Sequence, residues 1–440
     1  MRSAVMPAAV IAKGAIVEAR GELRSFTPWE VAMTDGKPQK DGKTALRRVI
    51  SGPLLVLYGL GTMLGAGIYA LIGEVAGVAG VLAPGAFLLA AIIASLTAAS
   101  FAELSSRLPK SAGPAAYILE GFQSRRLSFI SGILIIASGV ISSGVMFRGF
   151  VGYAGDFLEF PAWAGFFALC VAVGAIAAWG IAESVVVVAA ITLLEAGALI
   201  LVIVLGFGAD AAPASEIHPG GVAPLAGVVS GAVLAFYAFI GFEDMVNVAE
   251  EVKQPRRVMP LSIILALALT TLIYILVSWT AVRTTPVSML QESNSPMTLL
   301  YSRLTDFPAQ TMSVIAMIAV VNGALVQVIM ASRMLYGMST QKTLPSWFGQ
   351  ISARTRTPVN ATLFVVMLIF LAASALPLAT LAQVTSFLLL SVFALVNAAL
   401  IRLKQMSPAE NGFEVPVWTP YLGAVSAAAF ALVSLKEIFA

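Results

Sequence analysis

The chain has 440 residues, of which 59% are hydrophobic and only 11% are charged. A single water-soluble core does not use so many apolar residues, so the excess must face lipid. The net charge of +3 comes from basic residues that lie between apolar segments, which argues against a nucleic-acid partner. Length, composition and charge therefore exclude a soluble domain and predict an integral protein of the lipid bilayer.

The first 45 residues differ from the rest of the chain. They mix charges of both signs with Gly and Pro, and their apolar run from Ala4 to Ala12 is too short to cross a membrane. We predict a flexible cytosolic tail over 1–45. Arg2 followed by an apolar run also resembles the start of a signal peptide, but no small-residue cleavage site leads into a soluble domain.

Eleven later segments have the length and apolar character of membrane-spanning helices. About 20 residues of helix cross the hydrocarbon core, and the runs lack the alternating pattern of barrel strands. The predicted spans are 49–73, 80–104, 127–155, 161–181, 184–208, 224–250, 259–282, 308–337, 359–376, 378–402 and 417–436. Little more than Pro377 separates the ninth span from the tenth, so one kinked helix is the alternative there.

The distribution of Lys and Arg predicts how the spans are oriented. Twenty-two of the 26 basic residues lie in the tail or in alternate loops, which are cytosolic if the N-terminus is cytosolic. The other loops carry Asp156, Glu159, Asp210, Glu216 and the sole histidine, His218. Eleven spans then place the C-terminus outside, and we expect the plasma (inner) membrane as the location.

Two of the predicted spans are rich in glycine. The first contains Gly59, Gly61, Gly65, Gly67 and Gly73, and the sixth contains Gly227, Gly231 and Gly241, followed by two carboxylates. Glycine weakens a helix interior by about 1 kcal/mol relative to Ala, and a helix at membrane depth unwinds only where it lines a cavity. Breaks in the first and sixth of ten helices predict two inverted five-helix repeats with a binding site at their interface. The same glycines also suit close helix packing, and these residues alone do not decide between the two.

Several motifs resemble a known superfamily. The segment Gly61-Thr-Met-Leu-Gly-Ala-Gly-Ile-Tyr69 resembles the first-helix signature of the amino acid–polyamine–organocation superfamily. Phe236–Glu243 and Ala249–Arg256 resemble its sixth helix and the cytosolic loop that follows. Further loop matches follow in order between about residues 49 and 425, namely Arg107–Pro114, Ser332–Tyr336, Thr357–Asn360 and Phe413–Pro416. These loop matches resemble the cationic amino acid transporter branch as well as general amino acid permeases.

This resemblance implies an all-α integral membrane fold with a LeuT-type five-plus-five inverted repeat and broken helices 1 and 6. We expect the first repeat over 46–208 and the second over 209–402. A cytosolic loop and an eleventh helix would occupy 403–440. Members of the superfamily commonly have twelve helices, which puts any role of a twelfth helix in doubt here.

The resemblance also implies how an amino acid would bind. Exposed amides of Gly65, Ala66 and Gly67 would hold the substrate carboxylate, and nearby carbonyls would accept from its ammonium. The expected substrate-binding residues are Thr62, Met63, Gly65, Ala66, Gly67, Ile68, Phe239, Ile240, Gly241 and Asn322, with Phe239 as a candidate gate. The remaining positions assigned to this pocket are Tyr69, Ser142 and Ser143. These mostly neutral surroundings favour a neutral amino acid, while Glu243 leaves a cationic one open.

Four charged residues stand out within the predicted spans, where each needs a partner or a task. For Arg148 we favour pairing with a carboxylate or extension to the outer headgroups. Glu243 and Asp244 follow the predicted break, where a structural cap and a proton-linked role for Glu243 are both open. Glu195 lies in Thr192-Leu-Leu-Glu195, where many relatives carry Thr-x-x-Lys, so the sign of the charge is reversed.

The reversed charge bears on ion coupling. A Glu at this place cannot imitate the lysine ammonium, so coupling of the lysine type is not carried over. A buried carboxyl favours its neutral form and suits a proton carrier, whereas a resident cation would hold it ionised. We hypothesise coupling to H⁺ through Glu195, in preference to Na⁺.

The function predicted from these features is secondary active transport of an amino acid by alternating access. The alternatives are an amino acid exchanger, or a non-transporting sensor or channel of the same fold. One histidine and one cysteine, Cys170, supply neither a disulfide nor a metal cluster, so we expect no enzyme, no metal and no cofactor. No Gly-x-x-x-x-Gly-Lys-Ser/Thr loop is found, which argues against ATP-driven transport by this chain alone.

Overall fold

The computed structural model describes residues 48–109, 113–179, 185–211, 224–340, 342–406 and 412–439. Residues 46–440 form one compact unit, and the predicted tail over 1–45 lies outside the described residues. Within the described ranges the chain is helical, and its β structure is limited to an isolated bridge between Ile50 and Val252. The all-α prediction is therefore confirmed.

Each predicted span has a helical counterpart. These are α2 (Gly52–Ala79), α3 (Ala83–Arg107), α5 (Arg125–Ala154), α6 (Ala162–Trp179), α7 (Val185–Gly208), α9 (Pro224–Ala238) with the 3-10 helix η2 (Phe242–Glu251), α10 (Pro255–Thr284), α13 (Gln310–Thr340), α14 (Val359–Ala375), α15 (Leu378–Met406) and α16 (Trp418–Ile438). In the described part of the chain, nine helical stretches are long and apolar enough to cross a membrane, and Gly52–Gly65 and Val359–Ala375 are shorter apolar helices. The exact number of crossings stays a prediction.

Local signals explain where several helices begin and end. Proline in the first turn starts α2, α3 and α10, where its missing N–H has no helical partner to lose. The Ser124 hydroxyl caps α5 by accepting from the Leu127 amide at 3.4 Å. Leu376 is extended, with φ −117° and ψ 143°, so α14 and α15 are two helices and not one kinked helix.

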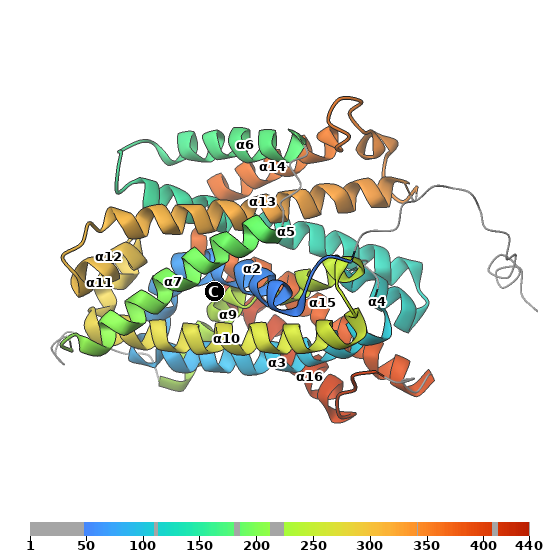
Figure 1. The fold of residues 1–440 in the computed structure, drawn as a ribbon, viewed down its shortest axis with the longest axis horizontal. Coiled ribbons are helices and arrows are strands. Elements are labelled where there is room, and N and C mark those ends of the chain that lie inside the picture. The colour runs from blue at the N-terminus through green and yellow to red at the C-terminus, as the bar shows by residue number, and fades with distance from the viewer. Residues whose placement is uncertain are drawn as a thin grey trace, which may run out of the picture. The chain divides into compact units, whose positions relative to one another are not determined.

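Short helices that the apolar pattern does not predict lie between the long ones. They are η1 (Gly80–Leu82), α4 (Gly113–Phe122), α11 (Val287–Glu292), α12 (Pro296–Leu304) and η3 (Ser346–Gly349). In Figure 1, α2 and α9 lie in the middle of the bundle, between α5 and α13 on one side and α3 and α10 on the other. The two glycine-rich spans are thus enclosed by the rest of the fold.

Segments predicted to share one side of the membrane lie together. At one end of the bundle, the Ile50 amide donates to the Glu251 carbonyl at 3.0 Å, and the Ser106 hydroxyl donates to the Arg256 carbonyl at 2.9 Å. At the opposite end, Asp156 accepts hydrogen bonds from Ser295 at 2.8 Å and Ser313 at 2.6 Å. The segments predicted to be cytosolic therefore lie at one end of the bundle and the outer loops at the other. We call these the Glu103 end and the Asp156 end.

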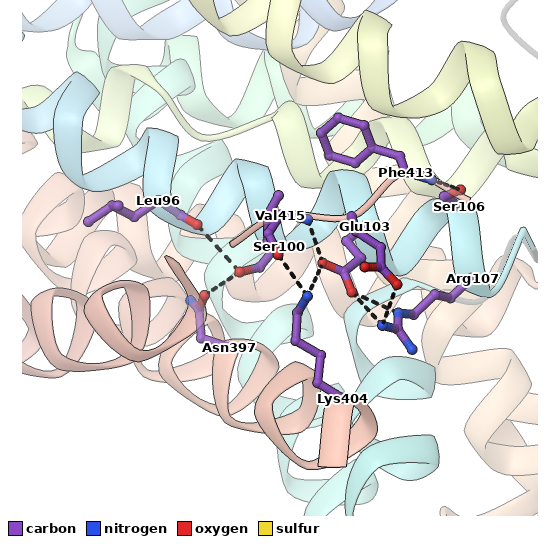
Figure 2. Close-up of polar contacts among 10 residues, drawn as sticks. Leu96, Ser100, Glu103, Ser106, Arg107, Asn397, Lys404, Phe413 and Val415 are labelled. Carbon is purple, nitrogen blue, oxygen red and sulfur yellow. Dashed lines mark hydrogen bonds and ion pairs between the residues drawn. The ribbon is translucent and has the colours of Figure 1, made fainter. Parts of the chain in front are cut away.

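The Glu103 end is named after a buried carboxylate at its centre. Glu103 of α3 is fully buried and lies 2.7 Å from Arg107 and 2.8 Å from Lys404 of α15. The same carboxylate accepts the Val415 amide at 2.8 Å. Figure 2 shows these contacts meeting at one side chain, which joins α3, α15 and the segment before α16.

Candidate functional site

The sixth span is broken in the middle, as predicted. Helix α9 ends at Ala238, two tight turns follow in which the Phe239 and Ile240 amides donate to Phe236 and Tyr237, and η2 begins at Phe242. Gly241 connects the halves with φ 126°, a backbone conformation that side-chain-bearing residues rarely adopt. A Cβ at this position would lie 2.6 Å from the Thr62 carbonyl oxygen, so glycine is required here for space as well.

The first span is not broken in this structure, contrary to our expectation. Helix α2 runs without interruption from Gly52 to Ala79. The amides of Gly65, Ala66 and Gly67 therefore lie inside a helix, where each donates to the carbonyl four residues earlier and is not available to a substrate. Close packing explains its glycines. A Cβ on Gly65 would meet the Ala319 carbonyl oxygen of α13 at 3.2 Å, and one on Gly67 would overlap Ala238 of α9. Backbone contacts that only glycine allows thus offset its poor helix propensity.

The middle of α2 contacts the break directly. The Thr62 hydroxyl donates to the Gly241 carbonyl at 3.0 Å. The Tyr274 hydroxyl of α10 donates to the carbonyls of Met63, at 2.5 Å, and Ala238, at 2.9 Å. The buried Phe239 ring lies 5.2 Å from the Tyr274 ring, centroid to centroid. The structure therefore brings predicted site residues from two distant segments together. These are Thr62 and Met63 of α2, and Phe239 and Gly241 at the break.

A cavity of about 140 Å³ lies beside the break, on the side toward η2. Its polar lining consists of Ser138, Ser142, Glu243, Asp244, Asn247 and Gln327, and its apolar lining includes Ile135, Ile240, Met330, Met334 and Leu389. Of the residues predicted for the substrate pocket or for a charged role, Ser142, Ile240 and Glu243 line this cavity. The predicted residues of α2 do not, and neither does Asn322, which is buried elsewhere on α13.

The polar residues of the cavity form a sparse network. Glu243 accepts the Gly241 amide at 2.9 Å and so caps the break. Asp244 accepts from the side-chain amides of Gln327, at 3.3 Å, and Asn247, at 3.4 Å. The Gln327 Oε1 atom is buried without a hydrogen-bond partner. Sequence reasoning missed Gln327, although an amide inside an otherwise apolar run was a signal that could have found it.

Glu195 of α7 is completely buried, and neither carboxyl oxygen has a hydrogen-bond partner. Its backbone carbonyl accepts the Tyr69 hydroxyl at 3.0 Å, which ties α7 to α2. Thr192, one turn earlier, packs directly on Gly61. The residue expected to carry a charge is therefore enclosed between helices, with no countercharge paired to it among the described residues.

Arg148 of α5 does not pair with a carboxylate within the described ranges, so that half of our expectation is wrong. Its guanidinium lies 5.7 Å from the centre of the Phe166 ring of α6, and its Nε atom is buried without a partner. A cation over an aromatic face gains electrostatic stabilisation without an ion pair. Across the described part of the chain, no three His, Cys, Asp or Glu side chains come close enough to hold a metal ion.

These features define a class of protein. Apolar helices that surround an interrupted span, a polar cavity beside the interruption and buried carboxylates are typical of membrane transporters with a binding site near mid-membrane. A family model described as amino acid permease matches residues 54–436, and the chain belongs to this family. It is therefore an integral membrane protein and not an enzyme.

Relatives from plants and bacteria agree on the family and differ in the named solute. The chain is 29% identical over 400 residues to the vacuolar cationic amino acid transporter 4 of Arabidopsis thaliana, covering 84% of this chain and 65% of the relative. It is 29% identical to a branched-chain amino acid permease of Bacillus subtilis (strain 168), with 83% of each covered. It is also 29% identical to a methylthioribose transporter of the same bacterium, with 87% of each covered. The chain spans less than two thirds of the length of the Arabidopsis relative.

Proposed function

We propose that this protein is a secondary active transporter that carries amino acids across the membrane by alternating access. The observation that carries the proposal is the break at Gly241, which packs on Thr62 of α2 and borders a cavity with polar side chains. Unwound backbone at membrane depth is tolerated only where protein or a water-filled cavity surrounds it. Family membership supports amino acids as the solute class.

The proposal includes an arrangement in the membrane. The N-terminus is cytoplasmic in the plasma (inner) membrane, and the C-terminus is outside if eleven helices cross. Two inverted repeats, 46–208 and 209–402, meet at the contact between α2 and α9, which moves against α5 and α13 during transport. Loops predicted to be cytosolic contact one another at one end of the bundle, and loops predicted to be outside contact one another at the other end. This separation supports the proposed orientation.

We further propose that H⁺ is the coupling ion and that Glu195 carries it. The Glu195 carboxyl is fully buried, and no described residue bonds to its two oxygens, so its ionised form has a high free energy. Binding of a proton removes this charge and lowers the free energy. The backbone carbonyl of Glu195 accepts the Tyr69 hydroxyl, so Glu195 adjoins α2, the helix that packs on the break. The alternative is that a bound Na⁺ balances the charge of Glu195, and the experiment must distinguish Na⁺ coupling from H⁺ coupling.

Uptake by proteoliposomes tests the proposal. Purified protein should accumulate labelled leucine or lysine in a saturable manner when the outside is made acidic, and a protonophore should abolish the accumulation. Replacement of Na⁺ by choline should change nothing. Saturable binding without accumulation would instead identify a sensor, and uptake that requires unlabelled amino acid inside would identify an exchanger.

A variant tests the role of Glu195 separately. Glu195→Gln should retain exchange between internal and external amino acid but lose the response to an imposed pH gradient. Glu292→Gln, an exposed carboxylate outside the cavity, is the matched control and should respond like the wild type. If Glu195→Gln accumulates substrate with the full pH response, the proton-coupling proposal is wrong while transport itself stands.

A further inference from the structure

We propose that the cavity beside the break binds the positively charged end of a cationic amino acid side chain, with Asp244 as the specificity-determining residue. This inference rests on the proposed function and names its substrate class. It departs from our expectation of a neutral amino acid, because the residues behind that expectation, apart from Ser142 and Ile240, do not line the cavity.

The charge balance of the cavity is the first argument. Glu243 and Asp244 are adjacent in sequence, are 5% and 4% exposed, and both line the cavity. None of the residues that line it is Lys, Arg or His. Two ionised carboxylates buried side by side without a basic partner are costly, and a proton or a cation lowers that cost. The charged tip of a cationic side chain supplies one such positive charge, whereas the α-ammonium of the substrate is balanced by its own α-carboxylate.

The second argument is an acceptor without a donor. The Gln327 side chain is 7% exposed and lines the cavity, and its Oε1 atom has no hydrogen-bond partner. This oxygen lies 3.0 Å from the place where a Cβ on Gly139 would be, so the absence of a side chain on α5 leaves room in front of it. A buried acceptor of this kind calls for an N–H donor, and ammonium and guanidinium groups carry several.

The hydrogen bonds of the two carboxylates separate their roles. Glu243 is held by the Gly241 amide at 2.9 Å and belongs to the cap of the break. Asp244 is held by two side-chain amides at 3.3 and 3.4 Å, both long for bonds to a carboxylate. Asp244 is therefore the carboxylate that is free to accept stronger, charge-assisted bonds from a ligand.

The apolar lining fits the rest of such a side chain. Ile135, Met330, Met334 and Leu389 supply surface for a methylene stem, while the acidic residues lie at the break. A stem that packs on apolar surface and a charged tip that stays among polar groups is the usual arrangement of Lys and Arg side chains. Sites for whole ligands have volumes of about 300–1,000 Å³. A cavity of about 140 Å³ therefore holds a side chain and not an entire large solute.

Pairs of amino acids of similar length with and without a cationic side-chain tip test this inference. In uptake by proteoliposomes, lysine should compete with the labelled substrate about ten-fold or more better than norleucine, and arginine likewise better than citrulline, because a charge-assisted bond in a buried site has at least that effect. Asp244→Asn should reduce both ratios to about one. Asp306→Asn, an exposed carboxylate elsewhere, is the matched control and should keep the wild-type ratios.

The outcomes separate this inference from the proposed function. Wild-type ratios near one overturn the inference even if the variant does not fold, and uptake of norleucine in the same experiment shows that the transporter proposal stands. Ratios that stay high in Asp244→Asn also overturn it. If Asp244→Asn instead changes the dependence on Na⁺ or pH and leaves the ratios unchanged, the carboxylate holds an inorganic ion or a proton. Absence of uptake of every amino acid contradicts the proposed function itself.

Discussion

The single proton of the Thr62 hydroxyl is shared between two carbonyl oxygens, that of Gly59 in its own helix at 2.9 Å and that of Gly241 at 3.0 Å. One side chain thus joins the middle of α2 to the residue at which the sixth span leaves helical geometry. The backbones are equally close, because a Cβ on Gly241 would lie 2.6 Å from the Thr62 carbonyl oxygen. A change in conformation at the break must therefore either move α2 as well or disrupt the contacts between α2 and the break.

Substitution of Gly241 should be the most damaging single change at the break. Gly241→Ala forces a Cβ onto a residue with φ 126° and toward the Thr62 carbonyl, at a cost of about 1–3 kcal/mol for the backbone strain alone. We expect a lower melting temperature of the purified protein and a large loss of uptake. Gly197→Ala is the control, because nothing lies within 4 Å of its Cβ position on α7. Equal melting temperatures for the two variants would contradict this prediction.

Removal of the Thr62 hydroxyl should weaken the contact between α2 and the break. Thr62→Val keeps the shape of the side chain and loses the bond to Gly241, which is worth about 0.5–1.5 kcal/mol. Thr271→Val is the matched control, since its hydroxyl bonds only to Leu267 within α10. The melting temperature should fall further for Thr62→Val than for Thr271→Val, and the uptake rate should change only in the former. The prediction does not hold if both variants behave alike.

The buried ion cluster at the Glu103 end should contribute strongly to stability. Glu103→Gln leaves Arg107 and Lys404, whose side chains are 13% and 11% exposed, without their shared carboxylate. Breaking a buried pair in this way costs about 3–5 kcal/mol. Glu414→Gln, in which a 51% exposed carboxylate 3.8 Å from Arg107 is removed, should cost about 0–1 kcal/mol. Thermal unfolding measures both, and a small effect of Glu103→Gln would show that the cluster is not a stabilising one.

Glu195 should behave in the opposite way, although it is as deeply buried as Glu103. No described residue donates a hydrogen bond to its carboxyl oxygens, so Glu195→Gln removes no described partner and adds no uncompensated charge. We expect a melting temperature equal to or above that of the wild type. A fall as large as that of Glu103→Gln would mean that Glu195 is held by a bound cation in the folded protein.

Much of the architecture could be predicted because it depends on local composition. A long run without charge in lipid leaves the helix as its only satisfied backbone conformation, so all the predicted spans are helical where the structure describes them. The break near Gly241 was predictable for a related reason, since glycines followed by two carboxylates make a poor continuous helix. Orientation, inverted repeats and the number of crossings remain predictions.

Other features could not be read from the chain, because each depends on residues far apart in sequence. Gly65 and Gly67 carry the same local signal as Gly241, yet they lie in a continuous helix, where Ala319 packs closely on Gly65 and Ala238 leaves no room for a Cβ on Gly67. The short helices α4, α11 and α12 have too few apolar residues to be recognised as spans and are held by tertiary contacts.

The sequence by itself determined that this protein is an all-helical membrane protein with an interrupted sixth span, because hydrophobicity and glycine content act locally, and its motifs carried the resemblance to amino acid permeases. Only the tertiary structure decided which side of the break holds a cavity and which side chains line it. Asp244 meets Gln327 across 83 positions of sequence, and Glu103 meets Val415 across 312. Such pairs depend on how the helices pack, and packing is a property of the whole fold.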